Sequence, residues 1–282
     1  MNINIEFEHY CKNGDIPRVR KLLGNPELDI TYNDYTGLYK AGQRHYFNLI
    51  KMVLEYYNDL PLLEMKNELM INASTSYNRS PIKAQSFIKY LLSSPKLKVH
   101  ADIHYMKDKL LIDAINSDNE KFIKYLLSSP KLKEHADIQA RNNALFLLAC
   151  EKSDVDFLQY LLESKKLKKH ATFSRDTQNY SCFFYAAHNR KDLDVINYLL
   201  NYFKETNREE NIEQAFLSTV YANNFILGRE LLVNNLFQLT PEYEKLISDI
   251  NNTDYIDMIN KFKLYENLQM LPLKEKPKTV KL

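Results

Sequence analysis

The sequence predicts an all-α protein, built as a solenoid of stacked antiparallel helix pairs. The first observation is an internal repeat, in which residues 87–98 recur without change as residues 122–133, 35 positions later. A degraded third copy begins at Phe157, after the same interval. The second observation is that each copy has apolar residues at helical spacing and then a turn. A period of this length is typical of one supersecondary unit, so neighbouring units must bury their apolar faces against each other.

The clearest unit covers residues 109–135. A first helix is indicated by a short apolar stripe of Leu110, Leu111, Ala114 and Ile115. Residues 117–119 break this helix, and a second one is predicted over residues 120–127. Pro130 follows and cannot continue a helix, so residues 131–143 are predicted as the connection to the next unit.

Other units repeat this order along the chain. Their second helices are anchored by one apolar residue each: Leu22, Val53, Leu91, Leu126, Leu161, Leu199 and Leu231. The sequence therefore predicts an array of about seven helix pairs over residues 1–265. Residues 2–9 and the segment after Pro241 are expected to cap its ends. Residues 266–282, which are rich in Lys and Pro, are predicted to form a basic, mobile tail.

Several motifs resemble the ankyrin repeat. Residues 144–150 (ALFLLAC) stand where that family has TPLHLAA, and residues 157–162 (FLQYLL) match its second helix. Residues 135–140 (HADIQA) match the hairpin loop that follows. Asn13-Gly14 fits the turn between the two helices, where other units place Asp118, Ser153 or Asn223. The chain departs from the family because it has no Thr-Pro-Leu-His and inserts a Pro-Lys-Leu-Lys segment before His-Ala-Asp.

The resemblance implies an ankyrin-like solenoid of helix pairs with hairpin-like loops, which binds a partner protein on its concave face. That face comprises the first helices and the loop tips. The positions it implies for the tips are Tyr32, Tyr35, His104, Tyr105, Lys107, Arg141, Asn142, Arg175 and Gln178. Tyr and Arg are the side chains that most often anchor interfaces. The tips differ between units whose framework is nearly identical, which fits both a surface shaped for one partner and drift at exposed positions.

Three histidines occupy equivalent positions, at His100, His135 and His170. A zinc ion needs its ligands at about 2.0–2.1 Å, whereas stacked helical layers lie roughly 8–10 Å apart. One ion therefore cannot gather all three, and we expect each histidine to form a hydrogen bond within its own loop. No metal site is predicted.

The same loops carry lysines at equivalent positions, which we call the lysine ridge: Lys96, Lys98, Lys131, Lys133, Lys166 and Lys168. Lys and Arg number 38 against 36 Asp and Glu, a net charge of +2, so any basic surface must be local. The ridge predicts either a site for an acidic protein surface or nucleic-acid backbone, or a solvated face partly neutralised by Asp102, Glu134 and Asp137. Few aromatic residues accompany it, which weakens the nucleic-acid alternative.

The sequence contains no GxxxxGK[ST], GxGxxG, GxSxG or HExxH motif, so neither an enzyme nor a cofactor is predicted. No stretch of about 18 apolar residues and no signal-peptide pattern is present. Three isolated cysteines, Cys11, Cys150 and Cys182, are predicted to be buried thiols, which indicates a cytoplasmic location in the source cell or in a host. Repeats of this kind are similar to those of intracellular bacteria and large viruses, which implies an effector or an inhibitor of a competing element.

Overall fold

The computed structural model describes residues 2–58, 60, 62–75, 81–173, 181–189, 193–206, 212–233 and 236–270, without the side chains of residues 142, 189 and 265–270. These residues form sixteen helices and no strand, which confirms the predicted all-α class. The helices are α1 (Ile3–Asn13), α2 (Ile16–Leu23), α3 (Tyr32–Gln43), α4 (Phe47–Tyr56), α5 (Leu63–Thr75), α6 (Pro81–Ser93), α7 (Tyr105–Asn116), α8 (Glu120–Ser128), α9 (Ala140–Lys152), α10 (Val155–Glu163), α11 (Cys182–Asn189), α12 (Asp194–Glu205), α13 (Ile212–Tyr221), α14 (Phe225–Val233), α15 (Pro241–Asp249) and α16 (Thr253–Met270).

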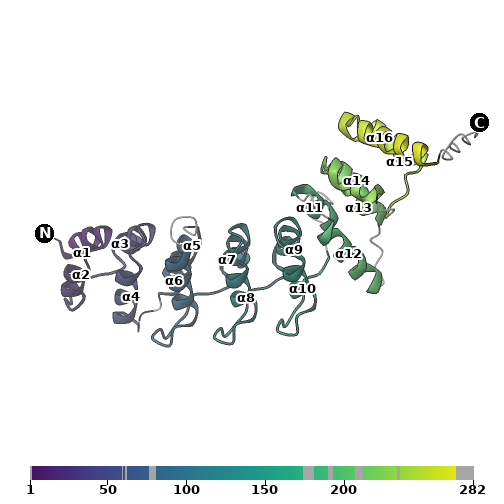
Figure 1. Ribbon diagram of the computed structural model, residues 1–282. Helices are drawn as coiled ribbons and strands as arrows, with labels where there is room; N and C mark the ends of the chain where they lie inside the picture. The colour runs from purple at the N-terminus through teal and green to yellow at the C-terminus, as the bar shows by residue number, and fades with distance from the viewer. Residues whose placement is uncertain are drawn as a thin grey trace, which may run out of the picture. The chain divides into compact units, whose positions relative to one another are not determined.

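Consecutive helices form pairs (Figure 1). The segment after Pro241, predicted as a cap, folds as the pair α15 and α16. Helix α16 ends at Met270 and so includes the first residues of the predicted tail. Residues 271–282 lie outside the described part of the chain. Among the described helices, none combines the length and the apolar character needed to cross a membrane.

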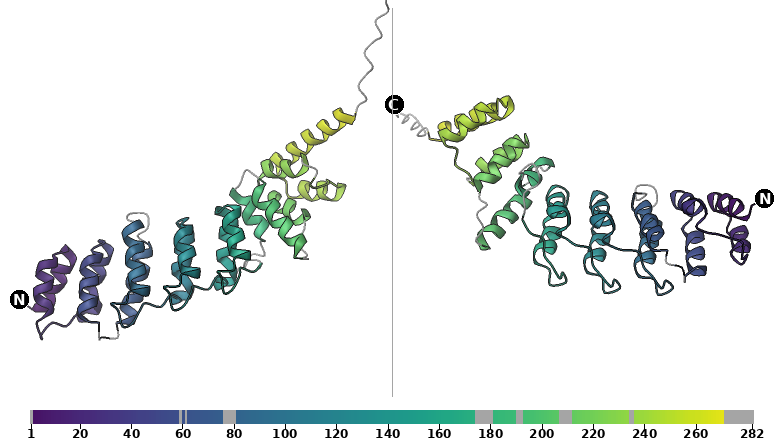
Figure 2. Two further views of the ribbon diagram at one scale, coloured as in Figure 1. Left: turned by 60° about the horizontal axis from the view of Figure 1, so that its bottom comes forward. Right: turned by 180° about the vertical axis from the view of Figure 1, so that it is seen from behind.

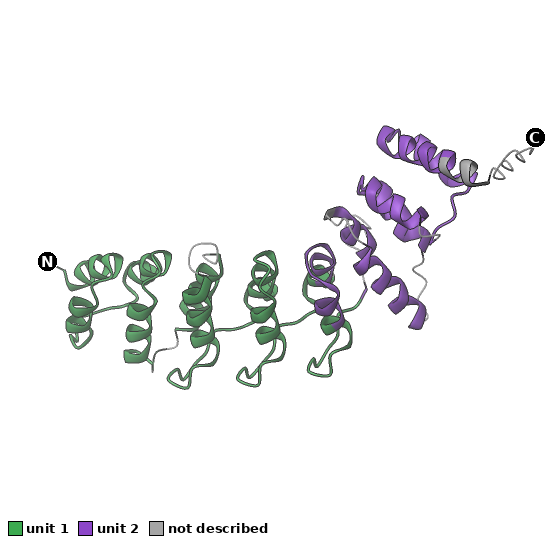
Figure 3. Ribbon diagram, in the orientation of Figure 1, with its two compact units in different colours: residues 1–145, 160–172 green, residues 146–159, 173–282 purple. Residues whose placement is uncertain are grey.

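The chain divides into two compact units (Figure 3). Unit 1 comprises Met1–Leu145 and Tyr160–Thr172, and unit 2 comprises Phe146–Gln159 and Phe173–Leu282. In unit 1 the first helices α1, α3, α5 and α7 pack in series, and the second helices α2, α4 and α6 do the same (Figure 2). In unit 2, α11 packs against α12 and α13, and α14 packs against α16.

The turn inside most pairs is a left-handed residue followed by a polar N-cap. Gly14, Asp118 and Asn223 have φ values of 70°, 53° and 54°, as their place in the predicted turn requires. The next residue caps the second helix: the carboxamide of Asn119, for example, accepts a hydrogen bond from the backbone N–H of Phe122 (3.1 Å). His45 and Asn251 also take the left-handed conformation at this position, although the sequence did not single them out.

The core is the apolar stripe that the repeat predicted. The equivalent residues Phe87, Phe122 and Phe157 have no exposed surface, and the same is true of six of the seven predicted anchors. Leu22 is the exception, because it is half-buried while Val19 and Leu23 of α2 face the interior. All three cysteines are buried, as predicted, and burial raises the pKa of Cys11 to about 12.

Neighbouring second helices of unit 1 are joined by a ladder of tyrosine contacts. The hydroxyls of Tyr125 and Ser93 lie 3.0 Å apart, and the ammonium of Lys89 lies 4.8 Å from the centre of the Tyr125 ring. The same two contacts recur one repeat later among Tyr160, Ser128 and Lys124. Each rung adds a hydrogen bond and a cation–π contact to the apolar packing, so adjacent units have a defined register.

Buried polar side chains join the first helices to the loops of the next unit. In each case a side-chain oxygen accepts a hydrogen bond from a backbone N–H at an equivalent loop position. These pairs are Asn67 with Asp102 (2.7 Å), Asp108 with Asp137 (2.8 Å) and Asn143 with Thr172 (3.3 Å). The acceptors are at most 7% exposed, so water cannot readily replace them.

Lys66 on α5 is a buried amine, only 1% exposed, whose Nζ donates a hydrogen bond to the carbonyl of Val99 (2.8 Å). Burial lowers the pKa of Lys66, because the charged form is poorly solvated. We expect Lys66→Met to raise the free energy of unfolding by about 1 kcal/mol at neutral pH, because it keeps the apolar stem and removes the buried charge.

The depressed pKa of Lys66 also makes a pH-dependent prediction. Its contribution to stability is fully present above the pKa of the unfolded chain and is lost as the pH falls through the lower folded pKa. The wild type should therefore gain stability relative to Lys66→Met on moving to alkaline pH, as measured by urea unfolding. A constant difference across that range would contradict the prediction.

Candidate partner-binding surface

Three loops in unit 1 have the same internal hydrogen bonds. In the first, the Nε2 atom of His100 lies 2.9 Å from the carbonyl oxygen of Ser94, and the backbone N–H of Ala101 donates to the carbonyl of Leu91 (3.0 Å). The imidazoles of His135 and His170 make the same contact with the carbonyls of their own loops, each at 3.0 Å. The expected role of the three histidines is thus confirmed, and each one folds its loop back onto the end of the second helix.

The lysine ridge lies on these loops. Lys131, Lys133, Lys166 and Lys168 are exposed and form no ion pair with a described residue. Two neighbouring cases are different: Lys96 pairs with Glu55 (3.1 Å), and Lys169, next to the ridge, lies 3.9 Å from Asp137. The free positive charge is therefore concentrated on the second and third loops.

Two hollows lie between successive loops of the ridge. The first, of about 270 Å³, is lined by Lys98 and Lys133 above a floor that includes Leu92, Ile103 and Leu132. The second, of about 300 Å³, has an equivalent floor of Leu127, Ile138 and Leu167 with lysines at its rim. Each is thus an apolar depression bordered by positive charge.

The residues predicted at the loop tips lie where the first helices start, and Tyr35 and Lys107 still have left-handed rather than right-handed helical backbone angles. Tyr32 and Tyr35 belong to α3, Tyr105 and Lys107 to α7, and Arg141 to α9. The bounds of α9 start at Ala140, but Arg141 and Asn143 are left-handed (φ 53° and 59°), so the right-handed helix follows the connection predicted over residues 131–143. The chain enters these helices through left-handed residues, and in α7 these are Met106, Lys107 and Asp108, with φ of 55–58°. This conformation is rare for such residues, so no propensity rule predicts it.

Tyrosines and a glutamate from three successive repeats lie close together on the first-helix side of unit 1. The rings of Tyr35 and Tyr39 make an edge-to-face contact at 6.4 Å. The hydroxyl of Tyr105 donates to the carboxylate of Glu68 (2.5 Å). That hydrogen bond raises the pKa of Tyr105 to about 12, and burial with the nearby charge of Glu68 raises the pKa of Tyr39. We call Tyr35, Tyr39, Glu68 and Tyr105 the tyrosine face.

Some predicted site residues are held by contacts inside the protein. The Arg141 guanidinium donates to the carbonyls of Met106 (2.8 Å) and Lys107 (3.2 Å). The Nδ1 atom of His104 lies 3.0 Å from the carboxylate of Asp108. The Arg141 contacts join adjacent repeats, whereas the contact of His104 with Asp108 lies at the start of α7 itself. Three further predicted positions, Arg175, Gln178 and the side chain of Asn142, lie outside the part of the chain that the structure describes.

Sequence reasoning did not single out Tyr39 or Glu68. Tyr39 could have been found by its place one helical turn after Tyr35, since residues four apart share a face. Glu68 had no comparable signal, because its partner Tyr105 is 37 residues away and belongs to the next unit. Only the packing of α5 against α7 brings the two together.

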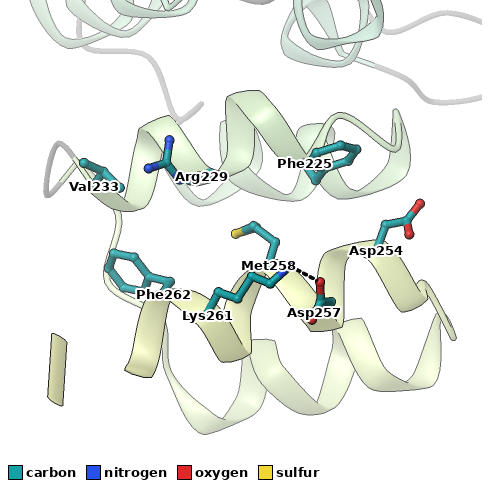
Figure 4. A pocket seen from close by; sticks show the side chains of 8 residues that line it. All are labelled: Phe225, Arg229, Val233, Asp254, Asp257, Met258, Lys261 and Phe262. Carbon is teal, nitrogen blue, oxygen red and sulfur yellow. Dashed lines mark hydrogen bonds and ion pairs between the residues drawn. The ribbon is translucent and has the colours of Figure 1, made fainter. Parts of the chain in front are cut away.

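Unit 2 contains a larger groove, of about 760 Å³, between α14 and α16 (Figure 4). Phe225, Val233, Met258 and Phe262 form its apolar part. Three of the charged residues at its border form ion pairs along their own helices: Lys261 pairs with Asp257 (2.6 Å), and Arg229 with Glu230 (3.3 Å). Among the described residues, no group of three or more His, Cys, Asp or Glu side chains is arranged to hold a metal ion.

Comparison with known proteins agrees with the repeat geometry. The family model for ankyrin repeats (three copies) matches residues 111–210. A search of curated proteins finds none that matches the chain. The matched region begins in α7 and continues into the segment after α12, so it contains the copies that start at Phe122 and Phe157 but not the one that starts at Phe87. With stacked helix pairs of the same period, this match shows that residues 111–210 contain ankyrin repeats.

Proposed function

We propose that the protein is a non-enzymatic binding module that holds a partner protein on the tyrosine face. Ankyrin repeats generally mediate protein–protein interaction. The observation that carries the proposal is the cluster of Tyr35, Tyr39 and Tyr105 beside Glu68, on the first-helix side that the sequence predicted to be concave. Tyrosine provides a large contact area at a small cost in side-chain entropy, and it is enriched among residues that dominate binding energy.

The tyrosine face is also held in place before a partner arrives. Its Tyr105 hydroxyl is fixed by Glu68, and the first helices beneath it are joined by an ion pair between Lys40 and Glu8 (2.8 Å). A pre-ordered surface loses less entropy on binding. The proposed mechanism is therefore occupation, in which a rigid surface blocks the partner or recruits it, as a host-directed effector or an inhibitor would. The three buried cysteines, none of which forms a disulfide with another described residue, support a reducing compartment such as a cytoplasm.

The tagged full-length chain should capture a protein from source or host lysate, with or without nuclease, and lose it when the tyrosine face is changed. We expect Tyr35→Ser with Tyr105→Ser to reduce capture by about tenfold or more, since truncating anchor residues typically costs more than about 1 kcal/mol each. The readout is quantitative mass spectrometry of the captured proteins.

A matched control is provided by two other tyrosines. Tyr56 and Tyr221 are more than half exposed and lie outside the tyrosine face. The pair Tyr56→Ser and Tyr221→Ser removes the same number of aromatic rings and should leave capture unchanged. Equal capture by both double variants would overturn the proposed site, and capture that disappears with nuclease would exclude direct protein binding.

A further inference from the structure

We propose that the lysine ridge and its two hollows bind an extended acidic segment of a protein, in which an apolar side chain recurs at every third residue. This site is separate from the tyrosine face, because it lies on the loops that follow the second helices. Figure 1 shows these loops below α6, α8 and α10, at the same end of three neighbouring pairs.

The lysine ridge carries positive charge that is not neutralised within the described part of the protein. Lys131, Lys133, Lys166 and Lys168 are exposed and have no acidic partner among the described residues. A ligand carboxylate would therefore not have to displace an existing ion pair. Two of these lysines, Lys133 and Lys168, line the same hollow, so one ligand can approach both.

The loops hold the backbone of these lysines in fixed positions. Leu132, between two lysines of the second loop, is only 8% exposed, and its backbone N–H donates to the carbonyl of Ser129 (3.1 Å). His135 closes the same loop by its contact with that carbonyl (3.0 Å). The backbone is therefore ordered before binding, and only the lysine side chains lose freedom when a ligand binds.

The two hollows have a shape and size that suit individual side chains of a ligand. Each has an apolar floor with lysine at the rim, and volumes of about 270 and 300 Å³ suit one or two side chains rather than a whole small molecule. The two hollows share Lys133 and Glu134, so they are adjacent along the ridge. A ligand with alternating apolar and acidic groups would fill both floors and meet the charges beside them.

The spacing of the hollows sets the period of the ligand. Packed helices lie about 8–10 Å apart, so equivalent loops recur at about this interval. A peptide extended in the polyproline II conformation advances about 3.1 Å per residue and has three residues per turn, so side chains three residues apart lie on the same side and cover one step of the ridge. The segment is expected to place an apolar side chain at every third position, with Asp or Glu between.

The same features argue against a nucleic acid. A phosphate backbone gains nothing from an apolar floor, and bases are best stacked on large aromatic rings, whereas the lining residues of the two hollows include no Phe, Tyr or Trp. Glu134 and Asp137 also lie among the lysines and would repel phosphates. Glu134 and Asp137 would repel an acidic peptide less than a nucleic acid, because apolar residues separate the carboxylates of the peptide.

The first experiment compares two fluorescein-labelled peptides by anisotropy with the full-length protein. One consists of four consecutive Leu-Asp-Glu triplets, and the other has the same composition with its leucines grouped at one end. We expect saturable binding of the triplet peptide and binding about tenfold weaker for the grouped one. Equal binding of the two peptides, or no binding of either, would overturn the proposal.

The second experiment places the site. Lys133→Glu with Lys168→Glu should weaken triplet-peptide binding by about tenfold, as expected when two favourable ion pairs become repulsive. Lys21→Glu with Lys204→Glu makes the same change in net charge at exposed residues away from the ridge, and should have little effect. Equal weakening by both pairs would show only a general effect of charge and would overturn the proposed site. Circular dichroism checks folding, and Gln replaces Glu if a variant does not fold.

Competition against the triplet peptide distinguishes a peptide ligand from DNA and lipid. A variant of the tyrosine face tests whether the two sites are independent. Duplex DNA or phosphatidylserine vesicles that displace the triplet peptide and bind more tightly than it does would overturn the peptide assignment. The variant carrying Tyr35→Ser and Tyr105→Ser should bind the triplet peptide as the wild type does. Loss of peptide binding in that variant would show that the ridge is not an independent site.

Discussion

Replacing Asp108 with alanine is expected to lower the free energy of unfolding by about 3 kcal/mol, because it leaves a buried backbone N–H without a partner. Asp108 is only 4% exposed, and its carboxylate accepts hydrogen bonds from the N–H of Asp137 (2.8 Å) and from His104 (3.0 Å). The first of these contacts joins α7 to the loop of the next unit. In a repeat array the interfaces between neighbours supply much of the stability, so the loss should appear in urea unfolding followed by circular dichroism.

Asp108→Asn is the matched control, because the chain itself uses asparagine for the same purpose. Asn67 and Asn143 occupy comparable buried positions, and their side-chain oxygens accept the corresponding backbone N–H groups. We therefore expect Asp108→Asn to retain the link and to remain within about 1 kcal/mol of the wild type. A loss as large as that of Asp108→Ala would show that the negative charge, rather than the acceptor, holds the interface.

The pKa of Asp108 gives the two variants different pH profiles. Burial raises the pKa of Asp108 above its ordinary value, so ionisation is less favourable in the folded chain than in the unfolded chain. The corresponding contribution to stability is present at acid pH and is lost as the pH rises through the folded pKa. The wild type should therefore lose stability relative to Asp108→Asn between acid and neutral pH, measured by urea unfolding at each pH. A constant difference would contradict this.

The second large effect is expected at Gly228 in unit 2. A methyl group added there would collide with the hydroxyl of Tyr255. Tyr255 has no exposed surface, and its hydroxyl forms a hydrogen bond with the hydroxyl of Thr219. Because α14 and α16 pack closely at this point, Gly228→Ala should lower the free energy of unfolding of unit 2 by about 3 kcal/mol. Hydrogen exchange of α13–α16 can locate the loss, since local opening exposes the affected amides.

Two further variants test the cause. Tyr255→Phe removes the colliding oxygen, so adding it to Gly228→Ala should recover part of the loss, although the ring still crowds the new methyl group. Gly24→Ala adds the same methyl group where the nearest atom is 3.9 Å away, and should be nearly neutral. If the Gly228 and Gly24 variants lose equal stability, the collision does not explain the effect, because helix propensity by itself favours alanine over glycine.

The fold was largely predictable, because its signals are local and repeated. The stripe containing Phe122 and Leu126 has the helical period, and its copies 35 residues apart required stacked units. Turns were also predictable where a residue suited to the left-handed conformation stood between helices, as at Gly14 and Asp118. The helix starts were not, because Lys107 and other residues adopt left-handed conformations that their side chains do not favour.

The candidate surfaces divide in the same way. The lysine ridge was visible because each lysine recurs with the repeat, and the loop role of His135 followed from its period. The tyrosine face was only partly visible, because Tyr105 meets Glu68 across an interface between units. Arg141 was predicted as a contact for a partner, whereas the structure places its guanidinium on backbone carbonyls of the preceding unit.

The sequence by itself determined the repeat length, the all-α class, the buried stripe and the loops that carry the lysines. Each of these depends on residues within one unit, where spacing along the chain is a direct measure of position in space. The tertiary structure alone decided which polar groups are buried, such as Lys66 and Asp108, and which lysines remain unpaired. Those properties depend on the neighbouring unit, because burial and ion pairing arise when two units pack and bring together residues more than 25 positions apart.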